Sequence, residues 1–139
     1  MNKKIKILVI GGTGFIGYHL SKKCIQIGWN VTSVSKSRPK KEKFIKGVKY
    51  KRVDLRKYKN VKNINKNFDY VVNSSGYINN NIIKKYNNDH FKILKNLVEH
   101  FKKSKIKHFL QIGTSAEYGG KYSPQVETAK CIPRSPYGK

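Results

Sequence analysis

The chain has 139 residues, which is enough for one domain with a substantial buried core. Hydrophobic residues make up 37% of it, too many for a disordered chain, and no stretch approaches the roughly 20 apolar residues of a membrane span. Cys24 and Cys131 show no metal-ligand spacing. We therefore expect free thiols in a reducing, cytoplasmic compartment, with no bound metal and no membrane attachment.

The formal net charge of +24 is the most extreme number in the composition. Lysine accounts for 27 residues and arginine for only four. Lysine has A/T-rich codons, so codon bias explains the excess without a ligand. Proteins that read nucleic-acid sequence rely on arginine for bidentate contacts. We therefore expect a solvated basic surface and no specific nucleic-acid partner.

Apolar and polar segments alternate along the chain, which predicts strands and helices in turn. The expected strands are residues 3–10, 30–35, 48–53, 69–73 and 107–112. A first helix follows Gly11-Gly12, with an apolar stripe of Ile16, Leu20, Cys24 and Ile27. Residues 57–67 are only weakly patterned.

A second amphipathic helix is expected around residues 91–101, with the stripe Phe91, Leu94, Leu97, Val98 and Phe101. Near the end of the chain, Ser135 followed by a proline is typical of a helix entry with serine as its N-cap. Strands that alternate with helices predict a parallel sheet covered on both faces. The fold class is therefore α/β, with residues 1–139 as one domain of about five strands.

The segment Gly11-Gly12-Thr13-Gly14-Phe15-Ile16-Gly17 lies between the first strand and the first helix. Missing β-carbons let phosphates approach the backbone, and the N–H groups of the helix N-terminus bind negative charge. A glycine at the last position lets helix and strand pack closely. The segment therefore predicts dinucleotide binding by a doubly wound, Rossmann-type domain.

The same segment resembles the fingerprint of the extended short-chain dehydrogenase/reductase family, the epimerases and dehydratases of nucleotide sugars. Further resemblances follow in the family's order, over essentially the whole chain. They are Val53-Asp54-Leu55, Val71-Val72-Asn73-Ser74-Ser75-Gly76, Gln111-Ile112-Gly113-Thr114-Ser115-Ala116-Glu117-Tyr118-Gly119 and Ser135-Pro136-Tyr137-Gly138-Lys139.

The resemblance implies an NAD(P)-dependent enzyme that acts on a nucleotide sugar. It implies Thr114, with Ser115 as runner-up, and Tyr137 as catalytic residues. The cofactor-binding residues that it implies are Gly11, Thr13, Gly14, Phe15, Ile16, Gly17, Asp54, Leu55, Asn73, Ser74, Ser75 and Gly76. Lys36 and Arg38 are two further candidates for cofactor binding, because of their positive charge. The full-length enzyme is expected to be a homodimer.

The chemistry of these residue types fits hydride transfer at a sugar carbon, which requires a hydroxyl proton to leave or return. A tyrosine phenol is a poor base at its ordinary pKa near ~10, and a lysine one helical turn later favours the phenolate. A threonine hydroxyl then hydrogen-bonds the substrate oxygen. The lysine expected four residues after Tyr137 would lie beyond Lys139, so we expect these 139 residues to be an inactive amino-terminal part of the enzyme.

Three departures from the family pattern refine the expected function. The second strand ends without the acid that binds the NAD ribose, and Lys36 and Arg38 follow it, which favours NADP over NAD. Thr114 is not followed by the Asp-Glu pair of the family's dehydratases, which favours an epimerase or 4-keto reductase. His90 stands where many members have asparagine. The alternative function is a non-catalytic, NADPH-sensing Rossmann module.

Overall fold

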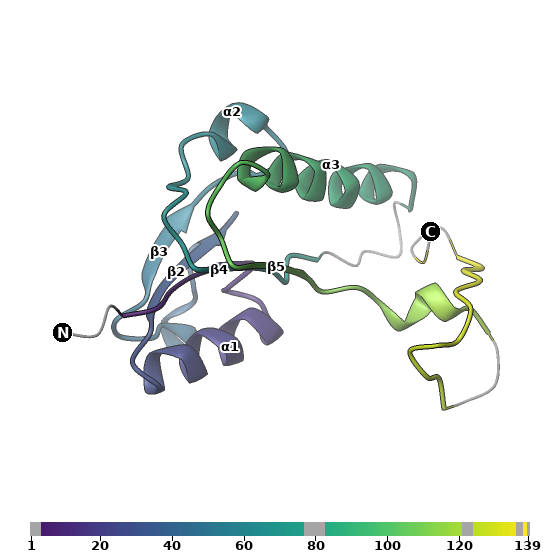
Figure 1. Cartoon of the computed structure of the whole chain (residues 1–139), viewed down its shortest axis with the longest axis horizontal. Coiled ribbons are helices and arrows are strands. Elements are labelled where there is room, and N and C mark those ends of the chain that lie inside the picture. The colour runs from purple at the N-terminus through teal and green to yellow at the C-terminus, as the bar shows by residue number, and fades with distance from the viewer. Residues whose placement is uncertain (1–3, 77–82, 121–123, 136–137, 139) are drawn as a thin grey trace.

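The centre of the molecule is a five-stranded parallel sheet (Figure 1). The computed structural model describes residues 4–76, 83–120, 124–135 and 138. The strands are β1 (Lys6–Ile10), β2 (Asn30–Ser35), β3 (Lys49–Arg52), β4 (Tyr70–Asn73) and β5 (His108–Gln111). Their spatial order is β3-β2-β1-β4-β5. This order confirms the predicted Rossmann-type α/β fold.

Helices lie on both faces of the sheet. The helix α1 (Phe15–Gln26) covers one face, and α2 (Tyr58–Val61) and α3 (Ile83–Phe101) cover the other (Figure 1). The chain runs outward from β1 to β3 and then returns to place β4 on the other side of β1. Because crossovers between parallel strands are right-handed, this reversal puts α1 on one face and α3 on the opposite face.

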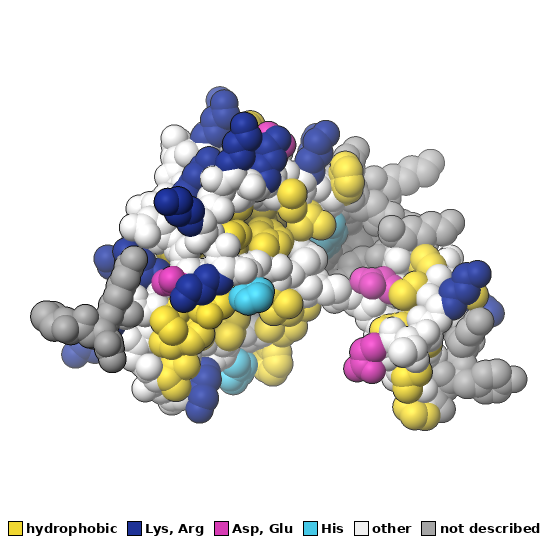
Figure 2. Space-filling model, viewed as in Figure 1, with side chains coloured by type: hydrophobic (Ala, Val, Ile, Leu, Met, Phe, Trp, Pro, Cys, Tyr) yellow, Lys and Arg dark blue, Asp and Glu magenta, His cyan; other side chains and the backbone are white. Residues whose placement is uncertain are grey.

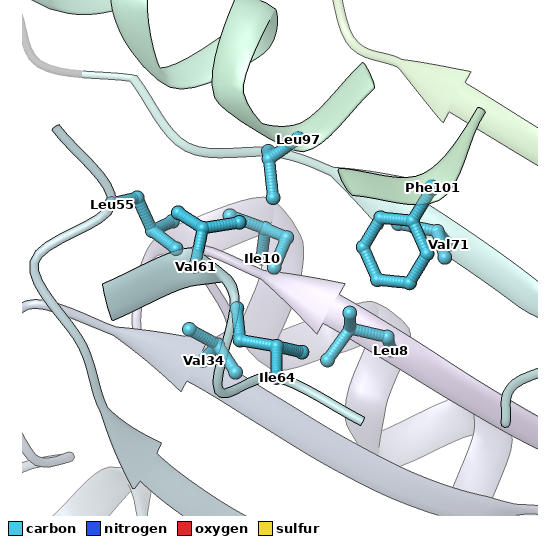
Figure 3. Close-up of a cluster of buried hydrophobic side chains, with 9 residues drawn as sticks. All are labelled: Leu8, Ile10, Val34, Leu55, Val61, Ile64, Val71, Leu97 and Phe101. Atoms are coloured by element: carbon cyan, nitrogen blue, oxygen red, sulfur yellow. The ribbon is translucent and has the colours of Figure 1, made fainter. Parts of the chain in front are cut away.

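The two faces of the sheet bury separate sets of apolar side chains. On the α3 side, Leu8 and Ile10 of β1 pack with Leu97 and Phe101 of α3 (Figure 3). The connection from β3 to β4 closes this cluster with Leu55, Val61 and Ile64. On the α1 side, a second cluster contains Ile7, Val9, Val31, Val72 and Cys24. Odd and even residues of β1 thus serve opposite faces, as expected for a strand buried on both sides.

The predicted apolar stripe of the first helix was partly wrong. The residues of α1 that are buried are Gly17, Ser21 and Cys24, whereas Ile16 is 50% exposed. The face against the sheet has small residues because α1 begins very close to the turn that follows β1. Side-chain size at the contact, which periodicity does not report, decides which face is buried.

The apolar stripe predicted for the second helix, α3, also differs from the face that the structure buries. Leu97 and Phe101 of α3 are buried, but Phe91 is 65% exposed and Val98 is 47% exposed. His100 is buried in their place. Polar residues on the buried face are bonded to the connection between β3 and β4, so the helix is rotated from the orientation that apolar spacing alone predicts. Within the described part of the chain, no helix combines the length and apolarity that crossing a membrane requires.

His100 joins α3 to the segment before β4. Its Nε2 lies 2.8 Å from the carbonyl oxygen of Ile64, and because a carbonyl only accepts, Nε2–H is the donor. Burial lowers the pKa of His100 below its ordinary value of 6.5. The folded state therefore holds the neutral ring, while the unfolded state takes up a proton near the ordinary pKa.

We predict that acidification destabilises the fold through His100. Its contribution is complete above about pH 6.5 and is lost as the pH falls toward the lowered folded-state pKa, with a limiting slope of about 1.4 kcal/mol per pH unit for one proton. Urea unfolding at pH 7.5 and pH 5.5 measures the change. His100→Gln keeps a side-chain donor but does not titrate, so its pH dependence should be smaller. An equal pH dependence in both proteins would contradict this role.

Candidate cofactor site and catalytic loop

A pocket of about 630 Å³ opens at the carboxyl edge of the sheet, where the chain leaves β1, β2, β3 and β4. The register places Ile10 of β1 beside Val34 of β2 and Asn73 of β4, so these strands end together. This is the point where the strand order reverses, the usual ligand site of a doubly wound sheet. The lining residues are Gly11, Thr13, Gly14, Val34, Ser35, Lys36, Ser37, Val53, Asp54, Leu55, Arg56, Ser74, Ser75, Gly76, His90 and Ile93.

The glycine turn forms one wall of this pocket, and its geometry requires glycine. Gly11 has a φ of +77°, and a Cβ there would lie 2.8 Å from the backbone nitrogen of Ser75. A Cβ at Gly17 would lie 2.7 Å from the Cα of Gly12 and collide with the carbonyl of Gly11. The turn leads into α1, whose first turn carries no acidic residue. The cradle therefore fits a pyrophosphate, with open space and unopposed helix N–H groups.

Asp54 lies on the wall formed by the end of β3 and pairs with Arg56, a residue that sequence reasoning missed. Asp54 Oδ1 accepts from Arg56 Nε at 2.9 Å, and Oδ2 accepts from Arg56 Nη2 at 2.8 Å. Hydrogen bonding and charge from Arg56 hold the pKa of Asp54 at about 2. The carboxylate is therefore ionised at neutral pH and remains 28% exposed toward solvent.

At the end of β4, Asn73 is buried and fixes the neighbouring residues rather than lining the pocket. Its Nδ2 donates to Gln111 Oε1 at 2.7 Å, and its Oδ1 accepts from the backbone nitrogen of Ser75 at 3.1 Å. Ser74 Oγ donates to the carbonyl of Ile10 at 2.7 Å. Asn73 thus links the pocket wall to β5, the strand that leads to Thr114.

Thr114 lies just past β5 and caps a short 3₁₀ helix, η2 (Ser115–Tyr118). Its Oγ1 accepts from the backbone nitrogen of Ala116 at 3.2 Å, and its own N–H donates to Glu117 Oε1 at 3.0 Å. In this capping box the hydroxyl oxygen acts as an acceptor, a role that uses one lone pair and leaves the hydroxyl able to donate its proton. Ser115, the runner-up, is the first residue of η2.

Tyr137 lies outside the described residues. Its neighbour Gly138 packs against Ala116 so closely that a Cβ on Gly138 would collide with the Ala116 carbonyl. Ser135 Oγ accepts from the Gly138 nitrogen at 3.1 Å, the bond expected of an N-cap serine. The last part of the chain therefore returns to η2, the turn that carries Thr114.

Not every predicted cofactor residue reaches the pocket wall. Phe15 and Ile16 are exposed at the start of α1, Gly17 is buried beneath the turn, and Arg38 is exposed without lining the pocket. The lining residues that sequence reasoning did not assign to the cofactor are Val34, Ser35, Ser37, Val53, Arg56, His90 and Ile93. Arg56 and Ser35 stand beside assigned motif positions, whereas Ile93 comes from α3 and has no local sequence signal.

Positive charge is distributed over the molecule rather than gathered at this pocket. Figure 2 shows lysine and arginine side chains on several separate parts of the visible face. Among the described residues, no group of three or more His, Cys, Asp or Glu side chains is placed to hold a metal ion.

Comparison with known proteins identifies the family. The sequence profile of the NAD dependent epimerase/dehydratase family matches residues 7–139. The chain belongs to the NAD-dependent epimerase/dehydratase family. No curated protein sequence matches the chain. The Gly11–Gly17 turn and the other motifs of the resemblance all lie within the matched range.

Solved structures, 4-epimerases of UDP sugars among them, share the fold of this family member. The UDP-Glc/GlcNAc 4-epimerase from Campylobacter jejuni has 27% identity and a TM-score of 0.84, with 96% of this chain and 45% of that chain covered. UDP-glucose 4-epimerase from Bifidobacterium longum, in complex with NAD⁺ and UDP, has 25% identity and a TM-score of 0.83, with 96% and 44% covered. Bordetella bronchiseptica WbmG, in complex with NAD and UDP, has a TM-score of 0.84 at 19% identity, with 99% and 47% covered, a likeness of fold alone. The chain spans just under half the length of each.

We predict that Gly17→Ala destabilises the fold by ~1–3 kcal/mol, because the added methyl group overpacks the contact between α1 and the glycine turn. The free energy of urea unfolding measures this. The matched control is Gly76→Ala, where the nearest atom to an added Cβ is His90 Cε1 at 3.9 Å, an ordinary contact. Similar stability losses in the two variants would show that the α1 contact is not special.

Proposed function

We propose that this chain is the cofactor-binding part of an NAD(P)-dependent nucleotide-sugar epimerase or 4-keto reductase. The observation that carries the proposal is the pocket at the switch point of the sheet, with a glycine turn and a helix N-terminus on one wall. Family membership and the 4-epimerases among the structural neighbours support the choice of chemistry. The neighbours are about twice as long, so the activity is proposed for the protein that contains this chain.

The residues of the pocket fit a dinucleotide. Gly11 and Gly14 line the pocket at the start of α1, and the first N–H groups of α1 would bind the charge of a pyrophosphate there. Asp54 and Leu55 line the same pocket and are proposed to contact the adenosine end, and Ser74, Ser75 and Gly76 line its wall at the end of β4. A bound nicotinamide dinucleotide would accept and return a hydride in an epimerase, or donate one in a 4-keto reductase.

Thr114 and Tyr137 are proposed to handle the sugar hydroxyl. The Thr114 hydroxyl donates to the substrate oxygen while its lone pair stays on the Ala116 N–H, which fixes the direction of the bond. Tyr137 takes the hydroxyl proton and returns it. The contact between Gly138 and Ala116 supports their proximity, because Gly138 directly follows Tyr137 and Ala116 is two residues after Thr114. Ser115 and Ala116 follow Thr114 in place of the Asp-Glu pair of the family's dehydratases, which favours epimerisation or reduction over dehydration.

The proposed function also includes a substrate, a second subunit and a preferred form of the cofactor. We expect a nucleotide sugar as substrate and a homodimer for the full-length protein; the exposed apolar side chains Phe91 and Val98 on α3 support a protein contact there. The proposed preference for NADP(H) rests on Lys36 and Ser37, because these two residues line the pocket and Arg38 does not line it. The Bifidobacterium longum 4-epimerase and WbmG are complexes with NAD, the other form of the cofactor.

We predict that the chain binds NADPH several-fold more tightly than NADH, because Lys36 attracts a ribose 2′-phosphate. Fluorescence titration of both reduced cofactors measures the ratio. Lys36→Ala should bring the two affinities together, and Arg38→Ala, which changes the same charge outside the pocket wall, should leave the ratio nearly unchanged. Equal affinities in the unsubstituted chain would contradict the NADP preference.

In the protein that contains this chain, Tyr137→Phe and Thr114→Val are each expected to lower kcat for nucleotide-sugar epimerisation or reduction by ~10²–10⁴, the usual contribution of a positioned proton-transfer group. Interconversion of UDP-glucose and UDP-galactose, or hydride transfer to a 4-keto sugar, is the assay. Thr114→Ser keeps both the cap and the hydroxyl and should retain activity. Dinucleotide binding without turnover of any nucleotide sugar would instead support the alternative, a non-catalytic NADPH-sensing module.

A further inference from the structure

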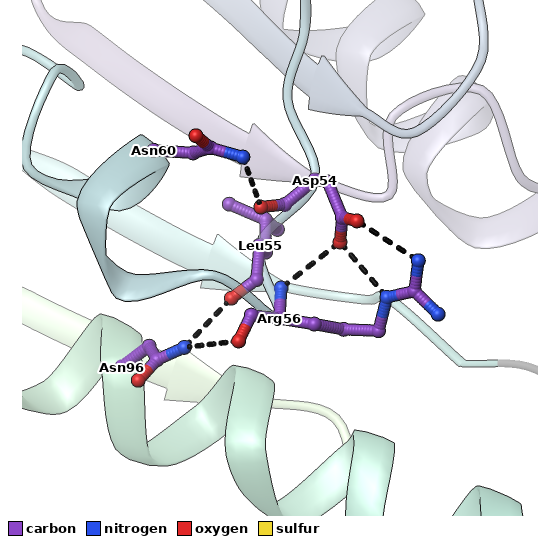
Figure 4. Close-up of polar contacts among 5 residues, drawn as sticks. All are labelled: Asp54, Leu55, Arg56, Asn60 and Asn96. Carbon is purple, nitrogen blue, oxygen red and sulfur yellow. Dashed lines mark hydrogen bonds and ion pairs between the residues drawn. The ribbon is translucent and has the colours of Figure 1, made fainter.

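The segment Asp54-Leu55-Arg56 lies between β3 and α2 and lines the cofactor pocket. Two asparagine side chains hold its three successive carbonyl groups (Figure 4). Asn60 Nδ2 donates to the carbonyl of Asp54 at 3.1 Å. Asn96 Nδ2 donates to the carbonyls of Leu55 at 2.9 Å and Arg56 at 3.2 Å. The backbone of this irregular segment is therefore fixed by amides from two helices.

The side chains of the same segment are fixed as well. Arg56 donates to Asp54 through its backbone nitrogen, Nε and Nη2. A carboxylate offers about four acceptor positions, so the hydrogen bonds of the described residues fill three of them. Oδ1 accepts two and Oδ2 accepts one, which leaves Oδ2 with one position for a further donor. The partly exposed carboxylate thus presents a single acceptor of fixed direction at the pocket.

Asn96 connects this acceptor to the rigid part of the fold. It lies on α3 between Ile93, which lines the pocket, and Leu97, which is fully buried against β1. Leu55 itself is buried in the same apolar cluster. Removing the Asn96 amide would leave two carbonyls of the segment without that donor and would free the turn to move relative to the core.

We propose that Asn96 is a positioning residue for base recognition: it holds the Asp54-Leu55-Arg56 segment so that the Asp54 carboxylate accepts a hydrogen bond from the exocyclic amine of adenine. This inference rests on the proposed dinucleotide function. An adenine amine donates to the carboxylate, whereas hypoxanthine carries a carbonyl oxygen at that position and cannot. A fixed carboxylate therefore discriminates between the two bases, and a mobile one loses this discrimination because it can turn away.

The test compares NADH with reduced nicotinamide hypoxanthine dinucleotide, which differs at that one group of the base. The unsubstituted chain should bind NADH at least about tenfold more tightly, the usual consequence of losing a hydrogen bond to a charged group. In Asn96→Leu this ratio should fall to about threefold or less, mainly through weaker NADH binding. Asn60→Ala, which releases the Asp54 carbonyl, should lower the ratio in the same direction.

The matched control is Asn65→Leu, the same chemical change at an exposed asparagine whose Oδ1 accepts from the Asn67 nitrogen, away from the pocket. It should leave the ratio unchanged. Melting curves establish that each variant folds, and if Asn96→Leu does not, the Asn60→Ala ratio decides. An unchanged ratio in the folded variants, or equal weakening of both ligands, overturns the positioning role. Equal binding of both dinucleotides by the unsubstituted chain overturns this inference alone, whereas binding of neither overturns the proposed function with it.

Discussion

The close approach of the β1–α1 turn to its neighbours is the constraint on which the rest of the structure depends. Gly11 lies under the backbone of Ser74 and Ser75, and Gly17 lies against Gly11 and Gly12. Atoms beyond Cα at these positions would separate β1 from β4 or lift α1 from the sheet. Because Gly11 and Gly17 have no side chains, the ends of β1 and β4 remain adjacent and α1 begins at the edge of the sheet. The pocket forms beside this turn.

This constraint also explains why the sequence predicted some features and not others. β1 and β4 were predictable because each contains a short apolar run stopped by turn residues, and the glycine turn was predictable because its spacing has a steric cause. The buried faces of the helices were not. Burial of Gly17 and Ser21 in α1 follows from a backbone contact, and burial of His100 in α3 follows from a partner 36 residues away in sequence. Periodicity contains neither kind of information.

The same distinction applies to the candidate site, where some residues were predictable from the sequence and others were not. Motif residues such as Asp54, Ser74 and Ser75 reach the pocket because they directly follow strands that end at one edge. Charge and position in sequence predicted Arg38 at the pocket, but Arg38 is not among the residues that line it. Arg56 does line the pocket, where it pairs with Asp54. Asn96 is 40 residues or more from the carbonyls that it holds. Residues that act on a site through such distant contacts become visible only when the fold brings the elements together.

The amide pair between Asn73 and Gln111 has a consequence for how such sequences diverge. A donor on β4 meets an acceptor on β5 at 2.7 Å, and the same Asn73 orients Ser75 through its oxygen. Asn73 uses both ends of its amide, so an aspartate would keep the bonds to Ser75 but set two acceptors face to face unless Gln111 reversed its own amide. That amide already donates to the carbonyl of Ile112. We expect positions 73 and 111 to covary among homologues, so that the pocket wall after β4 and the segment after β5 change as a pair.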